Sequence, residues 1–396
     1  MFINLCGKKS RFSLDSINIK LPMKLNKKSL LKNPVKHIDI TSFDSGAIID
    51  SMREMSFTSR DTANAADIFT KMLTDKKCTN ILTLAGSTSA GGCMQVYVDM
   101  IKYKMIDIIV ATGASIVDMD FFEALGFKHY KGSAFVDDNV MRNLYIDRIY
   151  DTFIDEDELQ TCDATVKKIA DSLKPGVYSS REFIKEMGKY LTKHSVKKNS
   201  LIQTAYEHNV PIFCPAFSDS SAGFGLVMHQ WENPIKHVSI DSVKDFLELT
   251  KVKIAARTTG LFMIGGGVPK NFAQDTVVCA EMLGVEAEMH KYAVQITVAD
   301  VRDGACSSST LKEASSWGKV ETTFEQMVYA EATTVLPLIV SYVYHNGFWK
   351  ARSYREWSRL FDTKAIIPAK TAMKPAKKKV VKKAPAKPVK KTVRKK

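Results

Sequence analysis

Apolar residues along the chain occur either at helical spacing or in short continuous runs, and the order of the two patterns predicts an α/β fold. Residues 62–73 carry apolar side chains at helical spacing, and residues 81–85 form an apolar run that predicts a buried strand. A glycine-rich turn at residues 86–92, a helix over residues 94–105 and a second apolar strand at residues 106–111 follow. This succession predicts a βαβ unit.

The same pattern occurs twice more along the chain. Residues 210–216 form an apolar run that leads into a turn rich in Ser and Gly, and residues 260–267 end in three glycines before a helix expected over about 271–283. Ser179 and Glu182 have the spacing of a capping box, which predicts a helix that starts near Ser179. We therefore expect a doubly wound, mostly parallel sheet of the Rossmann-like kind in one large domain.

The positive charge of the chain is concentrated at its C-terminal end. Residues 363–396 hold thirteen Lys and Arg394 and no acidic residue, so they carry the whole formal net charge of +14. Their Lys, Ala, Pro and Val composition predicts a disordered basic tail. The Lys- and Ser-rich residues 1–33 are interpreted as a mobile arm, with Met23 as an alternative start. Residues 34–362 then form the domain.

Composition also limits the class of protein. The chain has no run of about 18 apolar residues and no signal-peptide pattern, so we expect a cytoplasmic protein without a membrane span. The seven cysteines are widely spaced and never form a C-x-x-C pair, and the histidines never form H-E-x-x-H. These patterns favour reduced thiols and predict no metal site. The tail either contacts nucleic acid through counterion release or is a solvated arm.

The glycine-rich turns are the first candidate for chemistry. Residues 86–92 place glycines and hydroxyls between a strand and a helix, where backbone N–H groups can face a phosphate. One such loop, which does not match G-x-G-x-x-G, is explained as well by a tight turn. Three loops at one sheet edge favour a dinucleotide site. Asp219 and Asp303 lie where a carboxylate can hold ribose hydroxyls, although capping is the commoner role of Asp.

Lys319 is the strongest candidate for covalent chemistry. A lysine attacks an imine carbon only as the neutral amine, which a desolvated pocket favours. Trp317 can form an apolar wall and hold a cationic amine against its ring, and Glu313 adds a carboxylate for proton transfer. Spacing alone leaves the alternative open that Lys319 is a solvated lysine and Trp317 a core residue.

The residues around Lys319 resemble a known family. Residues 316–319 read Ser-Trp-Gly-Lys, and together with residues 290–296 and 328–332 they resemble deoxyhypusine synthase, in particular the bacterial deoxyhypusine synthase-like proteins. The resemblance extends from about Pro34 to Phe361. It implies an alkyltransferase of EC 2.5.1 type in which NAD takes a hydride from spermidine and the aminobutyl fragment forms an imine on a lysine. An acceptor amine then receives the fragment, and the hydride returns.

The resemblance also implies roles for individual residues and an assembly. Lys319 matches the imine-forming lysine, and the family is typically a homotetramer with active sites between paired subunits. Positions similar to those that hold NAD are Ser89, Ala90, Thr112, Gly113, Ala114, Asp219, Gly266, Asp303, Gly304, Ala330 and Glu331. Positions similar to those that face the amine substrate are Asp118, Ser221, Asn271, Glu313 and Trp317, of which Glu313 and Trp317 join Lys319 as the catalytic group.

Three positions depart from the eukaryotic members of the family. Those members carry Asp, His and Asp in the amine pocket, where this chain has Phe224, Asn271 and Cys306. A ring holds a cation less directionally than a carboxylate, and Asn cannot act as a general base. The expected acceptor is therefore a protein lysine or, in homospermidine synthesis, putrescine. An ordinary NAD dehydrogenase and a protein that mainly binds nucleic acid through its tail are alternatives of other classes.

Overall fold

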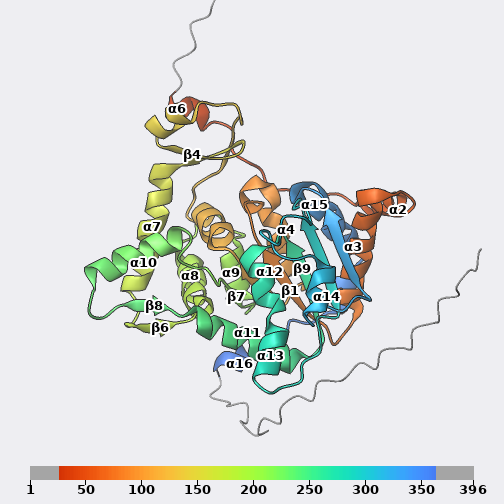
Figure 1. Cartoon of the computed structure of the whole chain (residues 1–396). Coiled ribbons are helices and arrows are strands. Elements are labelled where there is room, and N and C mark those ends of the chain that lie inside the picture. Colours follow the sequence, from red (N-terminus) through yellow and green to blue (C-terminus); the bar gives the residue numbers. More distant parts are fainter. Residues whose placement is uncertain (1–25, 363–396) are drawn as a thin grey trace, which may run out of the picture.

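The computed structural model describes residues 26–362, so the predicted basic tail and most of the predicted N-terminal arm lie outside this range. A six-stranded sheet lies at the centre, in the order β11-β10-β9-β1-β2-β7, and all of its strand pairs are parallel (Figure 1). Its strands are β1 (Thr79–Leu84), β2 (Ile108–Ala111), β7 (Ile212–Phe213), β9 (Thr259–Ile264), β10 (Tyr292–Thr297) and β11 (Glu325–Tyr329). The expected doubly wound α/β fold is confirmed.

The strand order reverses between β1 and β9. From β1 the chain adds β2 and β7 on one side, and it then returns to add β9, β10 and β11 on the other. Every residue of β1, β9 and β10 is buried, as is typical of parallel strands that are covered on both faces. Open sheets of this order bind ligands beyond the carboxyl ends of the strands at the reversal.

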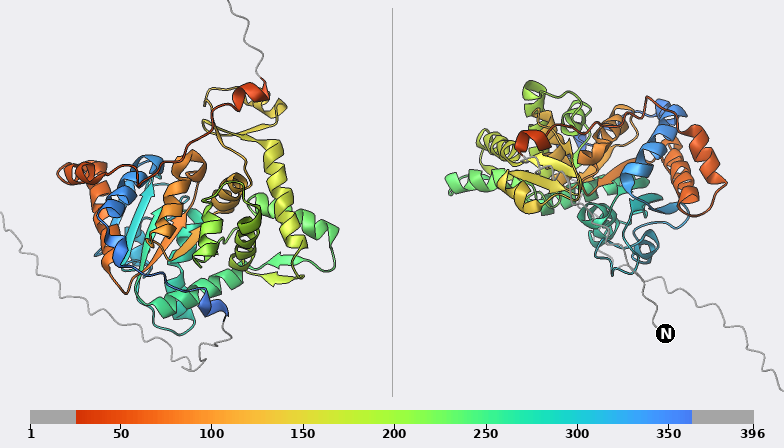
Figure 2. Two further views of the ribbon diagram at one scale, coloured as in Figure 1. Left: turned by 180° about the vertical axis from the view of Figure 1, so that it is seen from behind. Right: turned by 90° about the horizontal axis from the view of Figure 1, so that it is seen from above.

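Helices cover both faces of the sheet (Figure 2). One face packs against α2 (Gly46–Arg53), α3 (Phe57–Thr74), α4 (Met94–Lys102) and α15 (Ala332–His345). The other packs against α11 (Ser242–Ala256), α12 (Gly267–Gln274), α14 (Leu311–Ser316) and α16 (Arg359–Asp362), with α13 (Thr276–Met282) next to α11. Beside β7 lie α7 (Glu156–Asp171), α8 (Ser180–His194), α9 (Leu201–Glu207) and α10 (Ser221–Glu232). Shorter helical turns are η1 (Ser89–Cys93), η2 (Ala114–Phe121), α5 (Phe122–Ala124) and η3 (Phe348–Ala351).

A small antiparallel sheet projects from the main body. It consists of β3 (Tyr130–Lys131), β5 (Thr152–Asp155) and β4 (Ile146–Ile149), and it packs with α6 (Asp138–Asn143) and α1 (Lys27–Leu30) around a separate apolar cluster. The ammonium of Lys27 lies 2.6 Å from the Asp155 carboxylate. The last residues of the predicted arm therefore pack on this sheet. A further two-stranded sheet joins β6 (Gly176–Tyr178) and β8 (Val238–Ile240).

Several predicted boundaries can be compared with the structure. The capping box is present, because the Glu182 N–H donates to the Ser179 hydroxyl at 3.2 Å and the Ser179 N–H donates to the Glu182 carboxylate at 2.8 Å. The strand expected over 210–216 shrinks to two residues, since Pro211 and Pro215 have no N–H to offer a neighbour. The helix expected over 271–283 is two helices, α12 and α13, that meet at Asp275.

A buried ion pair ties the C-terminal end of the domain to the sheet. The Arg352 guanidinium donates to the Asp107 carboxylate at 2.7 Å, and it also donates to the carbonyl oxygens of Lys104 at 2.8 Å and Met72 at 3.2 Å. Both side chains are nearly inaccessible, with exposures of 6% and 2%. Burial raises the pKa of Asp107, and the positive charge of Arg352 opposes that rise.

Candidate active site

The loops that follow β1 and β2 contact each other at the carboxyl edge of the sheet. The Ser115 hydroxyl donates to the Gly86 carbonyl oxygen at 2.7 Å. A Cβ atom at Gly113 would overlap the hydroxyl of Ser220, the residue before α10, so only glycine fits there. These contacts bring Thr112, Gly113 and Ala114 close to the start of α10.

The turn η1 after β1 contacts the start of α15. A Cβ at Gly91 would lie 3.3 Å from the Thr333 methyl carbon. Glu331 is the N-cap of α15, and its carboxylate accepts the Thr333 N–H at 3.0 Å. In the same turn Ser89 and Ala90 are buried, and the Ser89 hydroxyl has no hydrogen-bond partner within residues 26–362. The turn that holds Ser89 and Ala90 therefore packs against the start of α15, where Ala330 and Glu331 lie.

An acidic group lies beside the start of α10. The Asp118 carboxylate accepts the Ser221 N–H at 2.7 Å, and loss of solvent raises the pKa of Asp118 in spite of this bond. Asp219 adds repulsion to the same carboxylate. On α7, burial raises the pKa of Asp163, which also interacts with Ser221 and Asp118. Asp163 was not among the predicted site residues, because nothing in its own segment indicates this contact.

The glycine turn after β9 is covered by the loop that follows β10. A Cβ at Gly266 would overlap the carbonyl oxygen of Ser307, and the Gly267 N–H donates to that oxygen at 3.3 Å. Asp303 accepts the Ser307 N–H at 3.2 Å, and Gly304 follows it with a positive φ of 68°. The second set of predicted cofactor positions thus forms one compact unit.

Lys270 is a buried cation directly behind this glycine turn. Its ammonium donates to the Gln295 side-chain oxygen at 2.7 Å and to the Ser309 carbonyl oxygen, and the Gln295 amide donates to the Gly265 carbonyl oxygen at 3.0 Å. Burial lowers the pKa of Lys270 to about 8, while Glu313 raises it and Lys319 lowers it further. Lys270 was not predicted, although it interacts electrostatically with both Glu313 and Lys319.

Lys319 forms a close pair with Asp275. The distance from its Nζ to Asp275 Oδ1 is 2.5 Å, and the side chains are 12% and 40% exposed. The same ammonium lies 5.3 Å from the centroid of the Trp317 ring, which is 68% exposed. Asn271 lies one helical turn before Asp275 on α12 and accepts a hydrogen bond from the Ser308 hydroxyl at 3.0 Å. Asp275 was not predicted. Its position one helical turn after Asn271 is the sequence feature that could have indicated it.

The local sequence explains how the lysine is presented. Helix α14 ends at Ser316, and Gly318 adopts a left-handed φ of 73°. The Gly318 N–H donates to the Ser315 carbonyl oxygen at 3.0 Å, and the Lys319 N–H donates to the Ala314 carbonyl oxygen at 3.1 Å. This is a Schellman motif, in which glycine is preferred at the left-handed position. The Trp-Gly-Lys segment is therefore a helix C-cap that fixes the lysine immediately after the turn.

Glu313 has a capping role at the other end of the same helix. Its carboxylate accepts hydrogen bonds from the Thr310 N–H at 2.6 Å and the Thr310 hydroxyl at 2.7 Å, which lower the pKa of Glu313. It also lines two cavities. One, of about 10 Å³, is shared with Asp303. The other is an open groove of about 560 Å³, where Asp61 and Glu325 add two more carboxyl groups and Lys312 adds one ammonium. Glu313 is thus a charged carboxylate at the rim of an acidic groove.

Within the single chain the predicted site residues form two groups, one at the glycine turns and one around Lys319. Gly266, the N-cap of α12, and Asp275, its C-cap, are separated by a helix of 8 residues, or about 12 Å. Lys319 and Trp317 therefore lie alongside α12 and away from the glycine turns.

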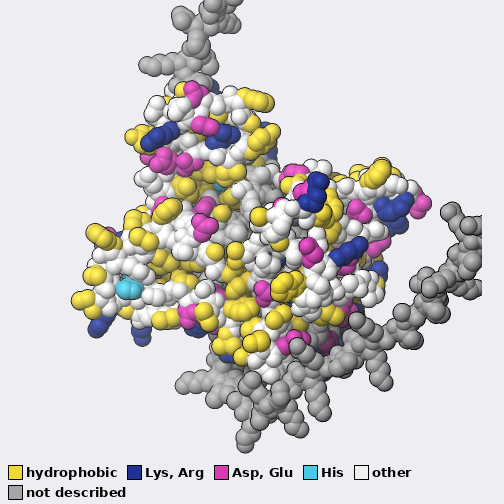
Figure 3. Space-filling view, in the orientation of Figure 1, with side chains coloured by type: hydrophobic (Ala, Val, Ile, Leu, Met, Phe, Trp, Pro, Cys, Tyr) yellow, Lys and Arg dark blue, Asp and Glu magenta, His cyan; other side chains and the backbone are white. Residues whose placement is uncertain are grey.

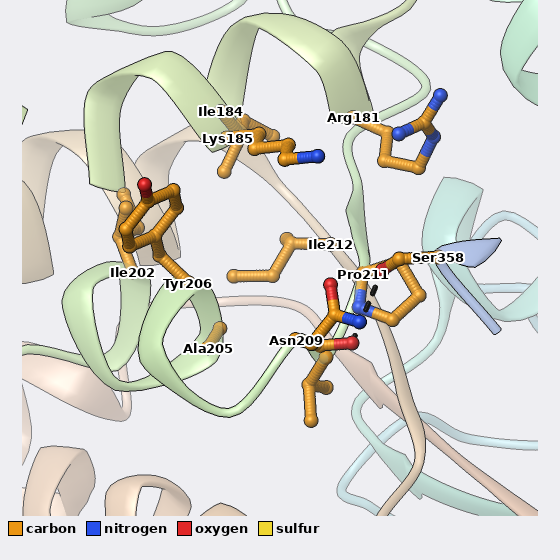
Figure 4. Close-up of a pocket in the computed structure, with 11 residues that line it drawn as sticks. Arg181, Ile184, Lys185, Ile202, Ala205, Tyr206, Asn209, Pro211, Ile212 and Ser358 are labelled. Atoms are coloured by element: carbon orange, nitrogen blue, oxygen red, sulfur yellow. Dashed lines mark hydrogen bonds between the residues drawn. The ribbon is translucent and has the colours of Figure 1, made fainter. Parts of the chain in front are cut away.

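The pocket in Figure 4, between α8, α9 and Ser358, contains none of the predicted residues. Within residues 26–362 no cluster of His, Cys, Asp and Glu suits a metal ion, and no helix could span a membrane.

Comparison with known proteins decides the family. A family model described as deoxyhypusine synthase matches residues 47–343. The chain belongs to the deoxyhypusine synthase family. It is 66% identical over 349 residues to a deoxyhypusine synthase-like protein of Coxiella burnetii, covering 88% of this chain and 99% of that protein. It is 69% identical over 345 residues to one of Caulobacter vibrioides, covering 86% and 94%. The expected resemblance is confirmed.

A solved structure of the deoxyhypusine synthase family shares the fold. The structure, from Entamoeba histolytica, aligns with a TM-score of 0.52 at 22% identity and covers 78% of this chain and 97% of that chain. The three positions expected to differ from eukaryotic deoxyhypusine synthase are exposed to different extents in this structure. Phe224 is 65% exposed on α10, Cys306 is exposed in the loop after β10, and Asn271 is partly buried on α12.

Proposed function

We propose that the protein transfers an aminobutyl group from spermidine or a related polyamine to an acceptor amine, with NAD as redox partner and an imine on Lys319 as intermediate. The observation that carries this proposal is the Lys319 amine, which a helix cap holds against an exposed indole ring and beside a carboxylate. An ammonium can rest on the ring, and the carboxylate can take its proton before attack.

The sheet edge offers a cradle that fits NAD. Three features are typical of sites for a dinucleotide phosphate and ribose. They are the buried Ser89 hydroxyl, which has no hydrogen-bond partner among the described residues, the N-terminus of α15 beside it, and glycines packed under neighbouring backbone. Asp303 and Glu331 would hold ribose hydroxyls, while Ser89 and the turn at Gly266 would face the diphosphate. The bound cofactor supplies reversible hydride acceptance.

The residues of this chain would then carry the remaining steps. Oxidation of the donor at a carbon next to its secondary nitrogen gives an imine, and attack by the neutral Lys319 amine releases 1,3-diaminopropane and leaves the aminobutyl group on the lysine. An acceptor amine would displace the lysine, and the bound cofactor would supply the hydride that reduces the new imine. The carboxylates of Asp61, Glu313 and Glu325 provide a groove of suitable charge for a polyamine.

A second copy of the chain would complete the site. The exposed Trp317 and the two separated groups of site residues support the homotetramer that the family implies. Figure 3 shows apolar side chains on the surface around α10, where Phe224, Val227 and Trp231 are exposed at helical spacing. Such an exposed stripe is typical of a surface that another chain covers. We therefore place the paired-subunit arrangement within the proposal.

Borohydride trapping tests the proposed function. Incubation with NAD and labelled spermidine followed by borohydride should attach an aminobutyl group to Lys319, detected by mass spectrometry of the peptide. Amine products are identified with and without putrescine. Homospermidine would identify putrescine as the acceptor, and a labelled protein lysine would identify a protein acceptor. Hydride transfer without any adduct would instead indicate an ordinary dehydrogenase and would contradict the proposal.

Gly266→Ala should weaken NAD binding. The added methyl group overlaps the Ser307 carbonyl oxygen and forces the loop after β10 away from the glycine turn. We expect the dissociation constant of NAD, measured by calorimetry, to rise at least about tenfold, the equivalent of one lost hydrogen bond. Gly176→Ala on β6, where the new methyl group meets no close atom, serves as the control. Equal affinity in the two variants would remove the glycine turn from the cofactor site.

Asp275→Asn should slow transfer. The variant keeps an oxygen near Lys319 but removes the negative charge that pairs with its ammonium, so the amine is held less firmly. We expect the steady-state transfer rate to fall about tenfold, as for the loss of one hydrogen bond to a charged group. Asp138→Asn, on α6 beside Arg148, should leave the rate unchanged. An unchanged rate for Asp275→Asn would mean that the pair does not control the amine.

A further inference from the structure

Buried polar groups connect the backbone at Lys319 to the residue before β10. The His290 N–H donates to the Lys319 carbonyl oxygen at 2.9 Å, and the His290 carbonyl oxygen accepts the Glu321 N–H at 2.9 Å. Together these bonds form a parallel bridge between His290 and Val320. The peptide unit that follows the lysine is therefore fixed at the amino-terminal end of β10.

The His290 ring makes two further contacts from a fully buried position. Its Nδ1 lies 2.8 Å from the Thr259 hydroxyl oxygen, and its Nε2 lies 3.2 Å from the Ala273 carbonyl oxygen. Lys253, which is also buried, donates to the same Thr259 oxygen at 2.8 Å and to the Arg257 carbonyl oxygen at 2.7 Å. Each polar atom of this cluster thus has a directed partner.

These contacts determine which nitrogen carries the proton. A carbonyl oxygen only accepts, so Nε2 carries the ring N–H and donates to Ala273 on α12. The Nδ1 atom of the neutral ring then accepts from the Thr259 hydroxyl, whose oxygen accepts from the Lys253 ammonium. Burial and the charge of Lys253 hold the pKa of His290 well below its ordinary value, and the ring is neutral.

We propose that His290 is a positioning residue for the attacking amine, because it fixes both members of the Lys319–Asp275 pair. It holds the lysine through the backbone bridge and the aspartate through α12, where Ala273 lies two residues before Asp275. The inference rests on the proposed role of Lys319. Lys253 and Thr259 act behind His290 by selecting the tautomer that can donate to α12.

His290→Leu tests the proposal, since leucine fills the space but makes neither ring contact. We expect the rate of borohydride-trapped adduct formation per NAD-binding site to fall roughly 100-fold, as a displacement of about 1 Å at a reacting group costs. His290→Gln, whose amide can still donate to Ala273, should recover part of that rate. His237→Leu, at a partly buried histidine before β8 and away from Lys319, should match the unchanged protein.

A second measurement needs no substrate and separates this inference from the proposed function. Lys319 is labelled with trace acetic anhydride at neutral pH, and its labelling rate is determined by mass spectrometry against the other lysines. The backbone bridge remains in His290→Leu, but Asp275 is held less firmly, so the Lys319 amine should react faster than in the unchanged protein. If the unchanged protein yields no trapped adduct, the proposed function fails while labelling still decides the positioning role. The inference is overturned if a folded His290→Leu variant shows unchanged labelling of Lys319 and, where adducts form, an unchanged trapping rate. A lower melting temperature of the variant would not alter that conclusion.

Discussion

Lys319→Arg is expected to abolish aminobutyl transfer and to leave NAD binding intact. Arginine keeps the positive charge that pairs with Asp275, but it stays protonated and forms no imine. We expect the steady-state transfer rate to fall at least about a thousandfold, as for removal of other enzymatic nucleophiles. The dissociation constant of NAD should change by less than about twofold, because the glycine turns lie one helix length away.

The matched control is Lys244→Arg. Lys244 lies on α11 and pairs with Glu182, away from the candidate site, so its replacement should leave the transfer rate unchanged. Borohydride should trap an adduct in Lys244→Arg and none in Lys319→Arg. Full transfer activity in Lys319→Arg would exclude the imine mechanism. It would favour the alternative of an ordinary NAD dehydrogenase.

Arg352→Met should destabilise the folded protein strongly. The replacement removes three hydrogen bonds and leaves the Asp107 carboxylate buried without its charged partner. Loss of one member of a buried pair costs about 3–5 kcal/mol of the free energy of unfolding, which urea denaturation followed by circular dichroism would measure.

Two further variants separate the buried charge from simple loss of contacts. In Asp107→Asn combined with Arg352→Met no unpaired charge remains, so part of the lost stability should return. Arg355→Met is the milder comparison, because its guanidinium lies 4.0 Å from Asp107 and is 28% exposed. It should cost about 1 kcal/mol or less. An equal cost for Arg352→Met and Arg355→Met would show that the buried pair contributes little.

Much of the central sheet could be predicted because its strands carry a local pattern. The apolar runs at β1 and β2 are fully buried parallel strands, and the glycine turn between β1 and α4 marks where the chain reverses direction. The sequence of the antiparallel strands β3, β4 and β5 shows no comparable apolar run. Its strands are two to four residues long, and their cluster forms only when α1 and α6 pack on them.

Candidate site residues could be named from the sequence, but the contacts between them could not. Trp317 and Lys319 were proposed from a local segment. Asp275 is far from Lys319 in the sequence, and their contact depends on how α12 packs beside α14. Spacing also could not show that Glu313 caps α14, since a capping carboxylate and a catalytic one have the same sequence pattern here.

The placement of Lys319 at a helix C-cap limits where the enzyme can be redesigned. Gly318 needs its left-handed backbone, and Val320 is bridged to His290, so libraries that vary this segment would mostly yield variants that lose the lysine's position. Asn271 is partly buried on α12, Phe224 is 65% exposed in the single chain, and neither takes part in that cap. Directed evolution toward other amine donors should begin at these two positions, and it can proceed there with Lys319 and its cap left unchanged.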